Sequence, residues 1–294
     1  MTALVSALAA MLAIVPYFVA ALLLFFLGKF LFDISTPGIK DDEELTTRDN
    51  PAFGVLFLGY MSGLAVALAG AFSSLGPSLL DNILDLGTSG LAAIILMRLS
   101  MALGEGIVLP GLKLESQIVA ERNLGAGFAF AGLLAANGFI IAGVMQGRSE
   151  SYLTELLDIG VYWAAGQVFL LLSWLLYRAI AKFDARACIG KGKNTAAGIS
   201  VGGFVVAAGL VLQAALAGAG SDLGAELLVT LAVGLCGLVL LAAARALSTF
   251  VLLPRAKLAD EVAVQGNVAA GTVSALSFVA VAIIFAALVR SQLG

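Results

Sequence analysis

The chain has 294 residues, of which 61% are hydrophobic and only 12% are charged, with a mean hydropathy of +1.06. Soluble domains carry about twice that share of charge and fewer apolar residues, so the composition places the protein in the lipid bilayer. The net charge of −3 argues against a nucleic-acid-binding surface, and the absence of histidine excludes imidazole metal sites and Ser-His or Cys-His catalytic pairs.

Eight runs of about 20 apolar residues predict membrane-spanning helices, because the Gly- and Ala-rich runs lack the alternation of barrel strands. In chain order, the predicted spans are about 6–31, 51–72, 87–108, 124–146, 159–181, 195–218, 226–252 and 268–289. We therefore expect an all-α polytopic membrane helix bundle with both termini on the same side of the membrane.

Positive charge is distributed unevenly between the two sides. Ten Lys and Arg residues lie in the connections after the odd-numbered spans, whereas the other side has only two, Arg148 and Arg290. The ten are Lys40, Arg48, Lys113, Arg122, Lys182, Arg186, Lys191, Lys193, Arg255 and Lys257. By the positive-inside rule, the ten-charge side is cytoplasmic and both termini lie on the non-cytoplasmic side.

A repeated motif marks the start of every even-numbered span. It consists of Asn, any residue, Ala or Gly, any residue, and Gly, and its asparagines are 73, 71 and 73 residues apart. The motif residues are Asn50, Asn123, Asn194 and Asn267 with Gly54, Gly127, Gly198 and Gly271. The asparagines can cap helices and the glycines permit close helix contact, which is an architectural role. The alternative is a ligand or ion site built from four asparagines at one depth around an axis.

Two halves match at an offset of 144 residues, which divides the chain into two four-helix transmembrane repeats, 1–146 and 147–294. Each contains two parallel two-helix units, which we expect to be related by an axis along the membrane normal. Three units also share residues upstream of the asparagine. A proline lies 13 residues before the asparagine, a lysine lies ten residues before it, and a Glu or Gln lies six residues before it and is followed by an aliphatic residue. These are Pro37, Lys40, Glu44 and Leu45; Pro110, Lys113, Gln117 and Ile118; and Pro254, Lys257, Glu261 and Val262. The lysine and the Glu or Gln are expected to pair on one face of a short interfacial helix.

The recurring pattern of Thr36-Pro37, Glu44-Leu45 and Asn50-x-Ala52 resembles the bacterial domain of unknown function 350. The resemblance covers nearly the whole chain as two tandem copies, although the third unit has Ala181 in place of the proline. It implies a multi-pass protein of the bacterial inner membrane without an assigned activity, sometimes associated with polyamine-synthase-like partners or envelope stress. It implies no catalytic residues.

Four side chains form a candidate intramembrane polar site. They are Arg98 near the middle of the third span, Glu105 two turns later on the same face, Asn137 in the fourth span and Arg245 toward the cytoplasmic end of the seventh. Arg98 is expected either to line a pathway or to lock helices together by bonding backbone carbonyls or Asn137. Arg245 is expected to extend toward the cytoplasmic interface.

Two classes of function fit these features. The first is a non-catalytic scaffold or sensor, and the alternative is an ion or small-solute channel or transporter with a pathway near Arg98 and Arg245. We expect no enzyme activity, cofactor or metal, because the sequence offers no constellation of residues for such chemistry. Membrane lipid is the expected partner and nucleic acid is not, while self-association and a cytoplasmic protein partner are left open.

Overall fold

The computed structural model describes residues 2–36, 38–146, 152–216, 223–252, 254–255 and 257–293. Pro37 and Arg148, both named above, lie outside this part of the chain. Within it the protein contains helices and no strand, and eight helices are long and apolar enough to cross a membrane. The chain is therefore a multi-pass membrane protein.

Eight long helices are joined by short helical segments. The long helices are α1 (Thr2–Ser35), α2 (Pro51–Gly70), α3 (Leu79–Leu103), α4 (Leu124–Val144), α5 (Tyr152–Ala181), α7 (Thr195–Leu216), α8 (Leu223–Leu247) and α10 (Val268–Leu293). The short segments are η1 (Glu43–Thr47), η2 (Ala71–Ser74), η3 (Gly104–Val108), η4 (Glu115–Ala120), α6 (Ala185–Gly190), η5 (Ser248–Leu252) and α9 (Leu258–Ala263).

Helices α3 and α5 begin eight and seven residues earlier than the apolar runs predicted. The added turns of α3 are capped by Ser78, whose Oγ accepts a hydrogen bond from the Asp81 backbone N–H at 3.3 Å. A carboxylate in the first turn interacts favourably with the positive end of the helix dipole. Acidic residues therefore stabilise these first turns, although they lower the hydropathy of the segment.

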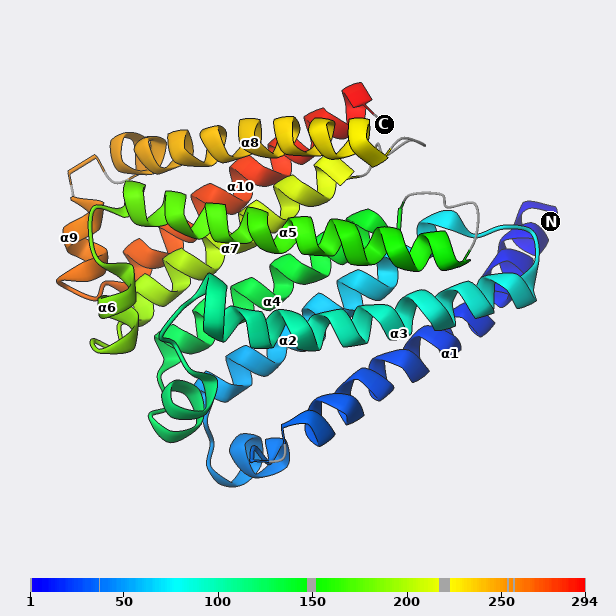
Figure 1. Cartoon of the computed structure of the whole chain (residues 1–294), viewed down its shortest axis with the longest axis horizontal. Helices are drawn as coiled ribbons and strands as arrows, with labels where there is room; N and C mark the ends of the chain where they lie inside the picture. The colour runs from blue at the N-terminus through cyan, green and yellow to red at the C-terminus, as the bar shows by residue number, and fades with distance from the viewer. Residues whose placement is uncertain are drawn as a thin grey trace.

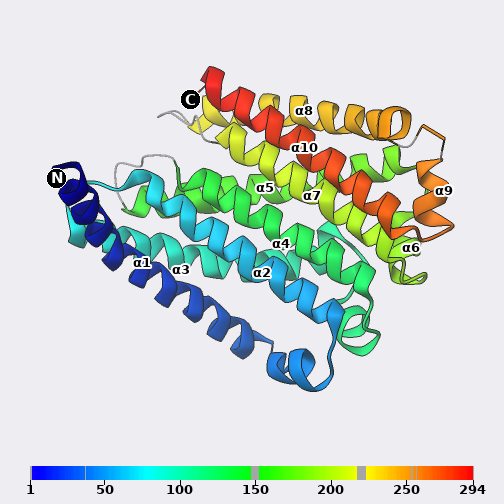
Figure 2. The same ribbon diagram turned by 180° about the vertical axis from the view of Figure 1, so that it is seen from behind.

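The long helices form two rows, and each two-helix unit contributes one helix to each row (Figures 1 and 2). One row runs α2, α4, α7, α10, and the other runs α1, α3, α5, α8. Because α2 and α10 lie at opposite ends of their row, the four units form an open line and do not surround an axis. Each unit contacts the preceding unit with one face and the next unit with a different face. Repeated contacts of this kind form a line of units unless the rotation between successive units closes a ring.

Glycines explain the close contact within the row of α2, α4, α7 and α10. A Cβ atom placed on Gly138 would lie 2.1 Å from the Gly63 carbonyl oxygen, and one on Gly132 would lie 2.4 Å from the Gly202 Cα. Lipid tails are as apolar as the side chains they would replace, so backbone packing of this kind supplies much of the attraction between membrane helices.

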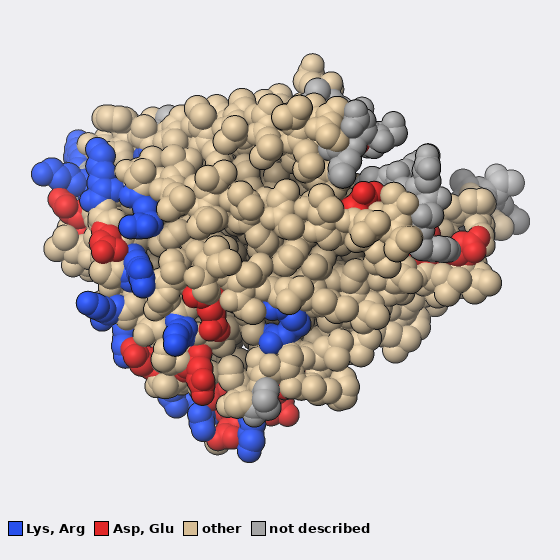
Figure 3. Space-filling view, in the orientation of Figure 1, with Lys and Arg blue, Asp and Glu red and all other residues tan. Residues whose placement is uncertain are grey.

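Charged side chains gather at the end of the molecule that carries α6 and α9 (Figure 3). This end comprises the connections 36–50, 104–123, 182–194 and 248–267, and is called the basic end below. All four asparagines of the repeat lie there, each directly before a helix of the row formed by α2, α4, α7 and α10.

Candidate functional site

Each asparagine of the repeated motif caps the helix that follows it. The Asn50 Oδ1 accepts hydrogen bonds from two backbone N–H groups in the first turn of α2, at 3.1 and 3.2 Å. Asn123, Asn194 and Asn267 each accept one from the N–H three residues later, at 2.9 to 3.2 Å. Such a cap satisfies a backbone donor that has no partner within the helix.

The amide nitrogen of the same side chain connects neighbouring units. In three units, Nδ2 donates to the backbone carbonyl that lies five residues before the next asparagine. These bonds run from Asn50 to Ile118 at 2.9 Å, from Asn123 to Ile189 at 2.7 Å, and from Asn194 to Val262 at 2.8 Å. The three accepting residues are fully buried; the first two bonds are buried as well, and the bond from Asn194 is partly buried. We call this contact the asparagine latch.

A second amide proton goes to the Glu or Gln six residues before the asparagine. The bonds run from Asn50 to Glu44 at 2.7 Å, from Asn123 to Gln117 at 2.7 Å, and from Asn267 to Glu261 at 2.8 Å. The expected pairing with lysine is absent from the first unit, where Lys40 lies 4.0 Å from Glu43 and Glu44 binds Arg48 instead. Both carboxylate oxygens of Glu44 are already occupied, because Oε1 accepts from Arg48 and Oε2 accepts from Asn50.

The residue before each asparagine has a left-handed backbone conformation. The φ angles are 47° at Asp49, 49° at Arg122, 48° at Lys193 and 62° at Gly266. The same turn therefore precedes all four helices. It escaped the sequence analysis because glycine, the usual signal for positive φ, occupies only one of the four positions.

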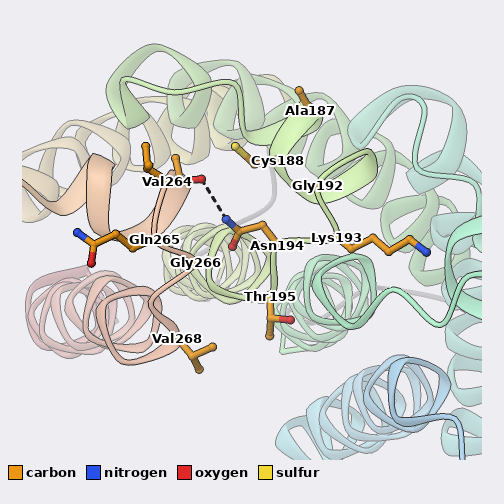
Figure 4. Close-up of a pocket in the computed structure, with 11 residues that line it drawn as sticks. Ala187, Cys188, Gly192, Lys193, Asn194, Thr195, Val264, Gln265, Gly266 and Val268 are labelled. Atoms are coloured by element: carbon orange, nitrogen blue, oxygen red, sulfur yellow. Dashed lines mark hydrogen bonds between the residues drawn. The ribbon is translucent and has the colours of Figure 1, made fainter.

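The third unit has Cys188 where the others have Glu or Gln, and a cavity of about 640 Å³ lies beside it. In Figure 4 the Asn194 amide points toward the segment that leads to Val264, and its nitrogen lies 3.4 Å from the Ala263 carbonyl. Burial, together with the Asp184 carboxylate, raises the pKa of the Cys188 thiol. The thiol is therefore protonated at neutral pH and is not an activated nucleophile.

Arg98 lies in the last two turns of α3 and not near the middle of the helix, because α3 begins eight residues and ends five residues earlier than the predicted span. Its guanidinium carbon is 5.1 Å from the centroid of the Phe32 ring, and its Nη2 is 3.4 Å from the Ser35 carbonyl oxygen. Its Nε is buried with no hydrogen-bond partner within the described chain. Arg98 thus ties α3 to the end of α1 through a cation–π contact and a long hydrogen bond.

Asn137 does not contact Arg98, although the sequence analysis allowed for this pairing. Its Oδ1 accepts hydrogen bonds from Ser100 Oγ and Gln167 Nε2, both at 2.7 Å, and Trp163 Nε1 donates to Ser100 Oγ at 2.9 Å. Two residues along a helix correspond to about 200°, so Arg98 faces α1 when Ser100 faces α4 and α5. Ser100, Asn137, Trp163 and Gln167 form what we call the polar cluster.

Glu105 lies in η3, the π-helical segment after α3, and not on the α-helix that carries Arg98. Within the described residues, no ion pair of 4.0 Å or less joins the two side chains.

Arg245 is held inside the second half of the chain. Its side chain is buried, and it donates to Ser274 Oγ at 3.1 Å and to the Ala181 carbonyl at 3.2 Å. Ala181 ends α5, just as Ser35 ends α1, so Arg245 and Arg98 hold equivalent helix ends in the two halves. Arg98 and Arg245 thus bind helix ends in different halves of the chain, and Asn137 belongs to the polar cluster.

Comparisons with known proteins identify one similarity. A family model described as Domain of Unknown Function (DUF350) matches residues 4–145 and 151–289, which agrees with the resemblance seen in the sequence and with two tandem copies. No curated protein and no solved structure matches the chain. Within the described residues, no group of three or more Cys, Asp or Glu side chains could hold a metal ion.

Proposed function

Since the chain belongs to the family of the domain of unknown function 350, with two tandem copies of the domain, we propose that it is a non-catalytic scaffold or sensor of the bacterial inner membrane. The polar cluster carries this proposal. Asn137 is fully buried and accepts hydrogen bonds from α3 and α5, and Ser100 is fully buried beside it. A conducting pathway needs polar groups that face water, whereas these groups face one another and hold three helices together.

A flux assay tests the proposal. Purified chain in liposomes should not raise the flux of ions or small solutes above that of protein-free liposomes, and Arg98→Leu should give the same baseline. Arg122→Leu, at an exposed position of the basic end, is the matched control. A flux that falls in Arg98→Leu, but not in Arg122→Leu, would support a channel or transporter near Arg98 and Arg245 and would overturn the scaffold.

We also propose that the basic end faces the cytoplasm, with both termini on the other side, because Lys and Arg concentrate at that end (Figure 3). A membrane-impermeant thiol reagent added to intact cells should label Ser291→Cys near the C-terminus and should not label Asp42→Cys in the first connection. Both positions are exposed, so their access to solvent is comparable. Labelling of Asp42→Cys alone would show the opposite orientation, with the basic end outside the cytoplasm.

The basic end is the surface that we propose a cytoplasmic partner would meet. The latches join its four connections into one continuous surface, which suits a scaffold. The family resemblance suggests a polyamine-synthase-like protein or a component of the envelope-stress response as the partner. Crosslinking in intact cells should recover such a protein through Asp42→Cys and not through Ser291→Cys. Recovery through Ser291→Cys alone would place the contact at the other end.

A further inference from the structure

A cavity of about 670 Å³ lies at the basic end between α5, α8 and α9. Three cationic side chains, Lys182, Arg245 and Lys257, line it together with a single carboxylate, Asp260. Within the described residues, no carboxylate lies within 4.0 Å of any of the three cations. The cavity therefore carries surplus positive charge that no ion pair neutralises.

Arg245 contributes most to the need for an anion. Only 7% of the residue is exposed, and its two hydrogen-bond acceptors, the Ser274 hydroxyl and the Ala181 carbonyl, are neutral. Burial of a guanidinium is unfavourable unless an anion compensates its charge. Because Arg245 lines the cavity, an anion bound there could supply that charge.

The rim of the cavity is apolar and faces outward. Phe250, which lines the cavity, is 76% exposed, and its neighbours in η5, Val251 and Leu252, are 60% and 50% exposed. The small side chains of Ala242 and Ala246 leave space beside α8. A ligand with an anionic head and a hydrocarbon tail would satisfy both the cations and this apolar rim.

The first half of the chain lacks the same surplus of charge. In the first half, Arg98 donates to the Ser35 carbonyl, and the next residue is Thr36. In the second half, Arg245 donates to the Ala181 carbonyl, and the next residue is Lys182. Near the same end of α1, Lys29 is neutralised by Asp33 and Asp41, at 2.6 and 2.8 Å. The repeat architecture therefore forms without the cation cluster, so the cluster calls for a separate explanation.

We propose that this cavity binds the headgroup of an anionic phospholipid, with its phosphate contacted by Arg245, Lys182 and Lys257 and its acyl chains lying along α8 and Phe250. Arginine matches the geometry of phosphate oxygens, and lysine adds point charge. Basic pockets between membrane helices are typical headgroup sites. This inference does not depend on the scaffold proposal, because a transporter with the same cavity would bind the same lipid.

Native mass spectrometry of the full-length chain in detergent, with phosphatidylglycerol or phosphatidylcholine added, tests the site. The wild type should prefer phosphatidylglycerol. The double variant Lys182→Gln with Lys257→Gln should bind it about 25-fold more weakly, at about fivefold for each lysine. Arg245 also ties α8 to α5, so the two exposed lysines are the safer positions to change.

The matched control is Arg122→Gln with Lys113→Gln. Arg122 shares the left-handed backbone of Lys182, with φ angles of 49° and 61°, and Lys113 is the repeat equivalent of Lys257. This variant removes the same charge from the basic end and should bind phosphatidylglycerol as the wild type does. An equal loss in both double variants would indicate general charge attraction and would overturn the site.

Two further outcomes would contradict the proposal. One is an equal affinity of the wild type for phosphatidylglycerol and phosphatidylcholine. The other comes from inorganic phosphate, added to the chain in phosphatidylcholine nanodiscs. If phosphate alone raises the thermal unfolding midpoint as much as phosphatidylglycerol does, and the lysine variants abolish the effect, the cavity is a site for a soluble anion and not for a lipid.

Discussion

A single asparagine side chain performs up to three tasks at each entrance to the row of α2, α4, α7 and α10. In Asn123, Oδ1 caps α4, one amide proton binds Gln117, and the other binds the Ile189 carbonyl of the next unit. Serine or aspartate could supply the cap, but neither provides two donors beside the acceptor. This requirement explains the asparagine at positions 50 and 123, where the side chain uses both kinds of donor contact.

Asn267 offers a natural comparison, because it caps α10 and binds Glu261 but makes no latch within the described residues. Asn123→Ala should reduce the free energy of unfolding by about 3 kcal/mol, since it removes a cap and leaves the buried Ile189 carbonyl unpaired. Asn267→Ala should lose only about 1 kcal/mol. Denaturant unfolding in detergent measures both values, and equal losses would mean that the latch adds nothing to the cap.

Asp41 gives the first connection a pH-dependent contact. Burial acts to raise the pKa of this carboxyl, but the hydrogen bond from Lys29 and a second from the Asp42 backbone N–H outweigh it, so the pKa lies below its usual value of 3.8. A depressed carboxyl pKa stabilises the folded state above the unfolded-state value and loses that effect as the pH falls through the folded-state value.

Asp41→Asn should therefore destabilise the chain at pH 7, by about 1 kcal/mol because Lys29 is partly exposed to solvent. The difference from wild type should shrink as the pH falls below about 4, where the wild-type carboxyl takes up its proton. Unfolding curves of the two proteins between pH 7 and pH 2 measure this, and a difference that does not change with pH would exclude the ion pair as its source.

At the scale of the helices, the glycine four residues after each asparagine sets the distance between neighbours. A Cβ atom on Gly198 would lie 2.1 Å from the Gly125 carbonyl oxygen, and one on Gly271 would lie 2.4 Å from the Ala196 carbonyl oxygen. Gly54 begins the row, and a Cβ atom there would meet only Leu45, at 3.7 Å. The glycine of the motif is thus tightly packed against the neighbouring helix inside the row, whereas at the edge of the row it has open space beside it.

Gly198→Ala should cost about 2 to 3 kcal/mol, because the added methyl group would push α7 away from the backbone of α4. Gly54→Ala should be neutral or stabilise the chain by up to about 1 kcal/mol, since alanine favours a helix and the space is open. Thermal unfolding of both variants in the same detergent tests the contrast. Similar losses would show that the glycine serves the helix itself and not the contact between helices.

The helices and their caps could be predicted from the sequence because both depend on local pattern: apolar length for the spans, and asparagine before Ala- and Gly-rich turns for the starts. The latch could not, since its acceptor is a backbone carbonyl about 70 residues away that carries no residue signature. The position of Arg98 along α3 differs from the predicted one because acidic residues such as Asp81 lower the hydropathy of the first turns, so the helix begins earlier than the apolar run.

At the scale of the whole molecule, the row has two unequal ends. In the part of the chain that the structure describes, the Asn267 amide donates to Glu261 and to no backbone carbonyl of another unit. At the opposite end, Leu45 occupies the position of the accepting residues Ile118 and Ile189, and no side chain in the described part of the chain donates to its carbonyl. The two ends are complementary, so a second chain could in principle continue the line.

Two leucines oppose that continuation. Inside the row, a glycine nine residues after the asparagine of one unit packs on a small residue that lies eight residues after the asparagine of the next unit. The pairs are Gly59 with Ala131, Gly132 with Gly202, and Gly203 with Ala275. At the free ends the same positions hold Leu276 and Leu58, which are 62% and 66% exposed. Terminal repeats that differ in this way commonly limit an array to its length.

Replacing both leucines by the small residues found inside the row should allow chains to join end to end. Leu58→Ala with Leu276→Gly restores the close approach that the asparagine latch needs, so that Asn267 of one chain can reach the Leu45 carbonyl of the next. Light scattering of the detergent-solubilised double variant should then give a mass that rises with protein concentration, while each single variant keeps the wild-type mass. Adding Asn267→Ala to the double variant should reverse the association. If the double variant keeps the wild-type mass at every concentration, features other than these leucines end the row.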